Sequence, residues 1–466
     1  MISFSSADLV IIILFFISVL SIGFFFGRSS KNDAEDYLLS GRKVGLLLFI
    51  LTNVATWYGG ILGVGEFVYR YGIVSWSTQG FPYYIFAFLF AIFFAKKIRE
   101  ASLFTIPDKL SQVYGKKVGL ISAVLVFALV SPAPYLLMTG NLISLIFGTN
   151  ILVSLILGLI LSLAYLFKGG FRSDLYTDAI QFFIMFVGFI LIIIFSYTSL
   201  GGFSFLQNNL PKEHLNLTGN ASPTFILVWF LIALWTFADP GFHQRCYAAK
   251  SGTTAVKGII ISIAFWFLFD SLTTLTGLYA RAYLPNLSNP ALSYPLLAEA
   301  ILPSGLKGIF YAALFATIMS TLNSFLFLSA TTISRDFIFK LSKKPDEKRL
   351  KTFAIYGLII SGILSVLLAY LIPSVIEIWY TIGSICIPGI ILPVVSSYYT
   401  KLKIDAKLIL LEMIVSVTAG LIWFFIRDYL ANSYLIEIEP MLVGLAASIM
   451  IHAIGLLLKF ISLPQR

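Results

Sequence analysis

The chain has 466 residues, of which 59% are apolar and 12% are charged, and its mean hydropathy is +0.93. Soluble domains carry about 25% charged residues, so this composition excludes an ordinary soluble protein and indicates a polytopic membrane protein. The formal net charge is +10, and the basic residues have to be tested as topology signals before a nucleic-acid partner is inferred. The two cysteines, Cys246 and Cys386, lie too far apart to indicate a disulfide framework or a metal site.

Thirteen apolar runs are long enough to cross a bilayer, which requires about 20 residues per helix. The fourth run is interrupted by Ser131-Pro132-Ala133-Pro134, and only a short polar stretch separates it from the fifth. We therefore expect an all-α membrane protein with spans at 7–27, 46–68, 76–95, 118–145, 150–167, 177–199, 224–246, 256–280, 306–334, 353–372, 376–398, 407–427 and 438–460.

The basic residues are distributed unevenly between the connecting loops. Alternate loops hold 27 of the 32 Lys and Arg, at 28–43, 96–117, 168–172, 245–257, 335–351, 401–407 and the C-terminal tail. Cytoplasmic loops retain Lys and Arg, so the pattern predicts a multi-pass protein of the plasma membrane with its N-terminus outside and its C-terminus inside. The membrane topology explains the basic charge, and we expect neither a nucleic-acid partner nor an obligate protein partner.

Two of the spans carry strong helix breakers. The second contains Gly59, Gly60, Gly63 and Gly65, and the seventh ends in Asp239-Pro240-Gly241, about 180 residues later. Unwound backbone is tolerated at membrane depth only where it is buried in protein or lines a cavity, so these breaks predict binding sites. Their spacing of five spans predicts two five-helix inverted repeats whose breaks face each other near the midplane. The alternative is that the glycines only allow close helix packing.

The ninth span carries a stripe of hydroxyl groups. Thr317, Ser320, Thr321 and Ser324 are three or four residues apart and therefore share one face of a helix. Such a stripe, opposite the free carbonyl groups of a broken helix, could supply the five or six oxygen ligands that a hard cation such as Na⁺ requires. The alternative is that each hydroxyl bonds back to the carbonyl group four residues earlier.

Acidic residues within spans are functional candidates because burying a charge in the membrane is unfavourable. Asp178 also has an alternative interpretation, as a helix-start carboxylate stabilised by the helix dipole. Asp270 could instead pack against the hydroxyl groups of a neighbouring helix, and Glu377 and Glu412 are close enough to span ends to be interfacial. The candidates are Glu66, Asp178, Asp239 and Asp270.

Three scattered histidines and the absence of a nucleophile–base pair give no support to metal hydrolase chemistry, and we do not expect an enzyme.

The chain resembles the sodium:solute symporter family, which includes the proline and pantothenate permeases and the sodium/glucose cotransporters. The resemblance covers nearly the whole length. It is carried by Asp36 to Arg42, Ala55 to Gly60, Gly169-Gly170 through Thr177-Asp178 to Gln181, Gln244-Arg245 with Ala248 to Lys250, and Ser320-Thr321 ahead of Arg335-Asp336.

The resemblance implies a LeuT-like 5+5 inverted-repeat core in a fold of about 13 transmembrane helices. The first repeat would span 46–199 and the second 224–400, joined by an extracellular loop at 200–223. One helix and a cytoplasmic loop at 1–45 would precede the core, and two accessory helices at 401–466 would follow it.

The resemblance also assigns a sodium site between the first broken helix and the hydroxyl stripe. Its ligands would be the backbone carbonyl groups of Ala55, Tyr58 and Thr317 and the hydroxyl groups of Ser320 and Thr321. A second register, anchored on Tyr69-Arg70-Tyr71-Gly72, would shift the first two carbonyl groups to Asn53 and Thr56. In some members a second sodium uses the acid matching Asp178 and further hydroxyls of the stripe, here Ser324; Asn323 interrupts these hydroxyls, so the existence of this site stays open.

In the family the solute lies at the two breaks, which nominates Trp57, Glu66, Gln79, Asp239 and Phe242. The overall expectation is a secondary active symporter that imports a small polar organic solute with Na⁺ by alternating access. Two acids near the cavity suit a solute with an amine or several hydroxyl groups. Open alternatives are proton coupling or cation-independent transport by the same fold, and a channel.

Overall fold

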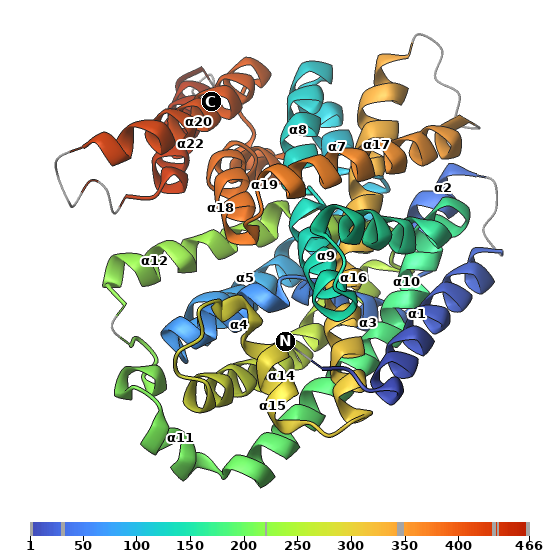
Figure 1. Cartoon of the computed structure of the whole chain (residues 1–466). Helices are drawn as coiled ribbons and strands as arrows, with labels where there is room; N and C mark the ends of the chain where they lie inside the picture. The colour runs from blue at the N-terminus through green and yellow to red at the C-terminus, as the bar shows by residue number, and fades with distance from the viewer. Residues whose placement is uncertain are drawn as a thin grey trace.

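The structure is a computed structural model, and it describes residues 3–28, 33–219, 221–342, 349–430, 435 and 438–462. Within these ranges the chain is helical and has no strand; one isolated backbone bridge joins Val44 to Ala249. Figure 1 shows the helices packed into one bundle, with the two C-terminal helices at its edge. The predicted all-α membrane fold is therefore confirmed.

Most helices match the apolar runs of the sequence. They are α1 (Ser6–Gly27), α3 (Leu46–Ala55), α4 (Ile61–Tyr71), α5 (Phe81–Phe90), α8 (Lys116–Leu129), α9 (Ala133–Phe147), α10 (Ile151–Leu200), α12 (Pro223–Ile232), α13 (Pro240–Ala248), α14 (Gly252–Tyr283), α16 (Leu306–Thr331), α17 (Leu350–Leu371), α18 (Val375–Cys386), α19 (Ile391–Ser397), α20 (Ala406–Ile426) and α22 (Pro440–Ser462).

Shorter helices lie between or beside them. They are α2 (Ala34–Leu39), α6 (Lys96–Ala101), α7 (Ile106–Tyr114), α11 (Phe203–Asn209) and α15 (Ser293–Ile301). Short segments of 3₁₀ or π helix extend several spans, among them η2 (Thr56–Tyr58), η3 (Trp76–Gly80), η6 (Ala233–Ala238) and η8 (Thr332–Phe339).

Ten helices of the described chain are long and apolar enough to cross a membrane, and two bent helix pairs raise the number to as many as twelve. One of the ten, α10, has 50 residues, which at about 1.5 Å per residue is about two and a half times the thickness of a bilayer core. Gly170 interrupts it with φ 53° and ψ −139°, a backbone conformation that other residues rarely adopt. With α10 divided at Gly170, the helices account for all thirteen predicted runs.

Helix α16 forms the centre of the bundle. In its most apolar window 89% of the residues are buried, compared with 22% for α1 and 28% for α20. It packs against α10, α9, α17 and the first turn after α3. A helix buried on all sides can present polar groups only to other helices, so the hydroxyl stripe has to find its partners within the protein.

Arg42 ties together the segments that flank the two breaks, on the face that carries the basic loops. Its guanidinium donates hydrogen bonds to the carbonyl groups of Ser102 (3.1 Å), Leu103 (3.1 Å) and Tyr247 (3.2 Å). Beside it, the backbone of Val44 forms two hydrogen bonds with the end of α13 and the residues that follow. Its amide donates to the carbonyl group of Ala248, and its carbonyl group accepts from the amide of Lys250 (2.8 Å). These contacts close the basic face between α3 and α13.

Replacing Arg42 with Ala should loosen this closure. Three lost hydrogen bonds at about 1 kcal/mol each predict that the amides of Val44 and Lys250 exchange with deuterium at least about tenfold faster. Hydrogen exchange measured by mass spectrometry tests this, with Lys43→Ala, an exposed neighbour, as the matched control. Equal exchange rates in Arg42→Ala and Lys43→Ala would contradict the assigned role.

Candidate functional site

The first break lies where the glycine cluster predicts it. Helix α3 ends at Ala55, one 3₁₀ turn follows, and α4 begins at Ile61 with its axis bent by 57°. The break is also tightly packed: a Cβ atom on Gly59 would lie 2.3 Å from Cβ of Thr321, and one on Gly60 would lie 2.2 Å from Cη2 of Trp379. Both roles predicted for the glycines therefore apply, because they interrupt the helix and also allow neighbouring helices to approach.

The second break is at Asp239. The 3₁₀ turn η6 ends before this residue, whose ψ of 117° is extended, and α13 begins at Pro240. The Oδ1 atom of Asp239 accepts a hydrogen bond of 2.9 Å from the amide of Phe242, so the carboxylate caps the N-terminus of α13. The Asp-Pro-Gly sequence thus breaks the span as expected.

The hydroxyl stripe of α16 faces the first break. Ser320 donates to the carbonyl oxygen of Ala55 at 2.9 Å and to that of Thr317 at 3.0 Å. Thr321 donates to the carbonyl oxygen of Thr56 at 2.7 Å. The hydroxyl of Thr317 bonds back to the carbonyl group of Ala313, so the packing alternative holds at this one position. Ala55 belongs to the first register of the sodium site and Thr56 to the second.

This cluster fits a hard monovalent cation by its chemistry. Its polar atoms are neutral oxygens from backbone carbonyl and hydroxyl groups, which are the ligands that Na⁺ prefers. All of the participating hydroxyl groups are buried, so a bound cation would be held away from water. Na⁺ could replace the hydroxyl hydrogens as the partner of the freed carbonyl groups of Ala55 and Thr56.

Asp178 lies directly behind this cluster and is 0% exposed. Its Oδ2 accepts hydrogen bonds from Thr52 and Thr56, the latter at 3.1 Å, and lies 3.6 Å from Nη2 of Arg245. Asp178 is well inside α10, so its interpretation as a carboxylate at a helix start is wrong.

One acid of this site is not among the candidates predicted from the sequence. Asp174 is also 0% exposed, and its Oδ2 accepts a hydrogen bond of 2.6 Å from Ser324. Its spacing of four residues from Asp178, on one helix face, was the signal that could have found it. Arg245 was noted as part of a family motif but not as a member of the site.

Three other acids, Asp270, Glu377 and Glu412, lie away from this cluster. Asp270 accepts a hydrogen bond from the hydroxyl of Tyr84, which agrees with the packing alternative. Glu377 is exposed as expected, but Glu412 is 0% exposed and bonds Ser448 and His452, so its interfacial placement is wrong. The helix pair α20 and α22 packs closely, which explains the burial. No group of acids, histidines and cysteines in the described ranges could hold a metal ion by itself.

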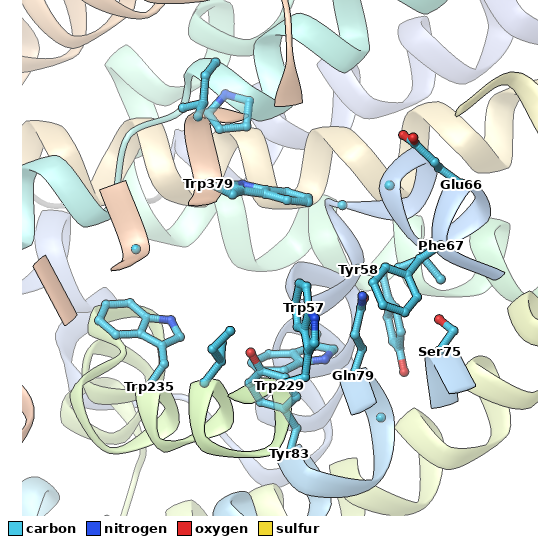
Figure 2. Close-up of a pocket in the computed structure, with 18 of the residues that line it drawn as sticks. Trp57, Tyr58, Glu66, Phe67, Ser75, Gln79, Tyr83, Trp229, Trp235 and Trp379 are labelled. Carbon is cyan, nitrogen blue, oxygen red and sulfur yellow. The ribbon is translucent and has the colours of Figure 1, made fainter. Parts of the chain in front are cut away.

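Two connected cavities lie next to the breaks. The wider one has a volume of about 560 Å³ and includes the predicted solute residues Trp57, Glu66 and Gln79 in its wall; Figure 2 shows Trp57 and Gln79 close together there. The deeper one has a volume of about 190 Å³ and includes Trp57, Asp239 and Phe242. The five predicted residues thus line these two adjoining cavities, and the smaller cavity also reaches Thr56 and Thr321 of the oxygen cluster at the first break. The two cavities share Trp57, Tyr83, Tyr135, Trp235 and Phe325.

Aromatic rings dominate the junction of the cavities. The ring of Trp57 lies 4.9 Å from that of Tyr83, 5.1 Å from that of Trp266 and 5.6 Å from that of Phe242, measured between centroids. Figure 2 shows Trp229, Trp235 and Trp379 around the wider cavity as well. Glu66, by contrast, forms an ion pair of 2.9 Å with Arg70 one turn later, which neutralises its charge.

A helical membrane bundle with two broken helices, an oxygen cluster at one break and a cavity beside it defines a cation-coupled secondary transporter. The chain belongs to the Sodium:solute symporter family, whose sequence profile it matches over residues 37–432. It is accordingly a transporter and not an enzyme, and Na⁺ is its coupling ion. The resemblance stated from the sequence motifs is confirmed.

Characterised relatives differ in the solute that their names specify. The chain is 27% identical to the high-affinity choline transporter 1 of Drosophila melanogaster over 80% of this chain and 64% of the relative, so it spans less than two thirds of that protein. It is also 27% identical to the sodium/pantothenate symporter of Haemophilus influenzae over 76% of this chain and 77% of the relative.

The fold is that of a known transporter structure. A Na⁺-coupled sialic acid symporter in a substrate-bound, outward-open state superimposes with a TM-score of 0.85, covering 99% of both chains at 17% identity. This likeness confirms the LeuT-like architecture. The exact division of the chain into two repeats remains a prediction.

The contact between Gly59 and Thr321 generates a test of whether the oxygen cluster at the first break binds sodium, and this cluster is called the sodium cluster below. Gly59→Ala should push the broken helix away from α16, at a cost of about 1–3 kcal/mol, and raise the Na⁺ concentration for half-maximal thermal stabilisation at least about tenfold. Gly45→Ala is the control, because nothing lies within 4 Å of a Cβ atom there. An unchanged Na⁺ midpoint in Gly59→Ala would show that this contact does not contribute to sodium binding.

Proposed function

We propose that this protein imports a small organic cation together with Na⁺ by alternating access. The observation that carries the proposal is the position of Asp239, a buried carboxylate at the second break, in a cavity walled by Trp57, Tyr83 and other aromatic rings next to the oxygen cluster.

The proposed sodium ligands are the carbonyl groups of Ala55, Tyr58 and Thr317 and the hydroxyl groups of Ser320 and Thr321. The hydrogen bonds of Ser320 and Thr321 to carbonyl groups at the first break support this set, with Thr56 as a further candidate. Bound Na⁺ would hold the broken helix against α16 and so stabilise the state that binds solute. Coupling requires that the state that binds solute has a higher affinity for Na⁺ than the other conformational state.

The proposed solute carries a positive charge. Aromatic faces attract ammonium groups, and a carboxylate among them adds a charge of the opposite sign. Asp239 supplies the carboxylate; Trp57 and Phe242 supply neighbouring rings, and Gln79 offers a hydrogen-bonding group in the wider cavity. Glu66 would act on the solute only indirectly, because Arg70 already neutralises it. The similarity to the choline transporter of Drosophila melanogaster supports a quaternary ammonium solute.

The proposed direction is into the cell. The wider cavity extends to Tyr71 and Ser75, at the face opposite the Arg42 contacts, and this supports entry from the side without the basic loops. Under the orientation predicted from those loops, that side is extracellular, with the N-terminus outside and the C-terminus inside. One Na⁺ crossing about 100 mV releases about 2.3 kcal/mol, and a tenfold Na⁺ gradient adds about 1.4 kcal/mol. The energy from Na⁺ alone would sustain a solute gradient of several hundredfold, and the membrane potential acting on the positive charge of the solute adds about 2.3 kcal/mol.

The double variant Ser320→Ala/Thr321→Ala tests the sodium ligands. Losing two of five proposed ligands should raise the Na⁺ concentration for half-maximal uptake at least about tenfold. Thr331→Val is the matched control, because this buried hydroxyl of the same helix bonds back to the carbonyl group of Phe327. Unchanged Na⁺ dependence of uptake into proteoliposomes would refute the assignment.

The charge of the solute is tested by a thermal-shift screen of the purified protein in Na⁺ and in K⁺. Choline should stabilise the protein in Na⁺ only, and its uncharged isostere with carbon in place of nitrogen should not. Asp239→Asn should abolish the effect of choline while preserving the cap of α13, since Asn is an equally good capping residue.

Glu100→Gln, at an exposed site, is the control for the Asp239 variant. Stabilisation by pantothenate or glucose, with none by choline, would overturn the cationic solute and leave sodium symport intact.

A further inference from the structure

The guanidinium of Arg245 lies between the two buried acids behind the sodium cluster. Its Nη2 donates to the hydroxyl oxygens of Thr56 (2.6 Å), Thr52 (3.2 Å) and Ser324 (3.2 Å) and lies 3.6 Å from Oδ2 of Asp178. The side chain of Arg245 is 3% exposed. A permanently charged group is thus fixed inside the membrane, on the helix that follows the second break.

The residues that the family resemblance assigns to a second sodium are the ones that hold this guanidinium. Asp178 is bonded by Thr52 and Thr56 and paired with Arg245. The hydroxyl of Ser324 accepts from Arg245 and donates to Asp174. One carboxylate oxygen of each acid and the hydroxyl of Ser324 are therefore already engaged by this guanidinium or by its neighbours, and a second Na⁺ would have to compete with a cation that belongs to the chain.

The buried charges also favour a single sodium. Asp174 and Asp178 are each 0% exposed and share one guanidinium, which leaves a surplus of one negative charge. Their Oδ1 atoms accept no hydrogen bond, as expected where carboxylates outnumber donors. Thr56 joins this group to the sodium cluster, since its hydroxyl donates to Asp178 and its carbonyl group accepts from Thr321. One Na⁺ at the break would make the group neutral, and a second would leave a buried positive charge.

We propose that the guanidinium of Arg245 takes the place of a second sodium ion, so that the protein binds one Na⁺ per transport cycle. This inference rests on the proposed sodium symport. The same charge balance includes the solute. The three buried carboxylates Asp174, Asp178 and Asp239 would be neutralised by one guanidinium, one Na⁺ and one organic cation. Asp270 stands apart from this set, because it is only half-buried in the wall of the wider cavity.

Direct counting of bound ²²Na⁺ on the purified full chain tests the inference without knowledge of the solute. At a Na⁺ concentration about ten times the wild-type midpoint, we expect close to one ion per chain in the wild type and no more than about half an ion in Ser320→Ala/Thr321→Ala. Two ions in the wild type, or one ion retained in the double variant, would overturn the inference, since either result requires a further site at Asp178. No bound ion in the wild type would refute sodium symport itself.

Variants of Arg245 give the complementary test. Arg245→Gln removes the charge and keeps a polar side chain, and we expect it to bind two ions per chain. Arg245→Lys keeps the charge and should bind one. Two ions in Arg245→Lys as well would show that the positive charge does not exclude the second ion. If Arg245→Gln does not fold, the counts for the wild type and for the double variant at Ser320 and Thr321 still decide the question.

Discussion

The hydrogen bonds between the hydroxyl groups of α16 and the carbonyl groups at the end of α3 are the interaction on which the site depends. Within a membrane every backbone carbonyl group needs a partner, and a helix that stops at midplane leaves several without one. Ser320 and Thr321 supply partners for Ala55 and Thr56. In the proposed sodium site a monovalent cation takes over this role, and the carbonyl groups freed by breaking the helix would then supply its ligands.

The polar groups behind this contact explain how the ion site is connected to the rest of the core. The carbonyl group of Thr56 accepts a hydrogen bond from Thr321 in the oxygen cluster. Its hydroxyl donates to Asp178 and accepts from Arg245 on the other side. Arg245 belongs to α13, beyond the second break, and its bonds to Thr52 and Thr56 link the two broken spans. The proposed ion site and the proposed solute cavity are therefore parts of one network, as coupled transport requires.

Sequence patterns were sufficient for features that depend on neighbours along the chain. The glycine cluster, the Asp-Pro-Gly sequence and the three-to-four spacing of the stripe fixed both breaks and the face of α16 that meets them. Features that depend on distant segments were not accessible in this way. Glu412 looked interfacial because nothing in its own helix indicates Ser448 and His452 on α22, and the role of Arg245 depends on three other helices. Asp174 gave a local signal, its spacing from Asp178, that was overlooked.

The close packing at the first break also constrains how the family can diversify. Gly59 has room for no side chain as long as residue 321 carries a Cβ-branched group, and Gly60 has none as long as Trp379 extends its ring over the break. A larger residue at either glycine becomes tolerable only with a smaller one at its partner. In homologous sequences the residue pairs 59–321 and 60–379 should consequently vary together. A family member with a smaller residue in place of the tryptophan should tolerate a residue larger than glycine at the position opposite it.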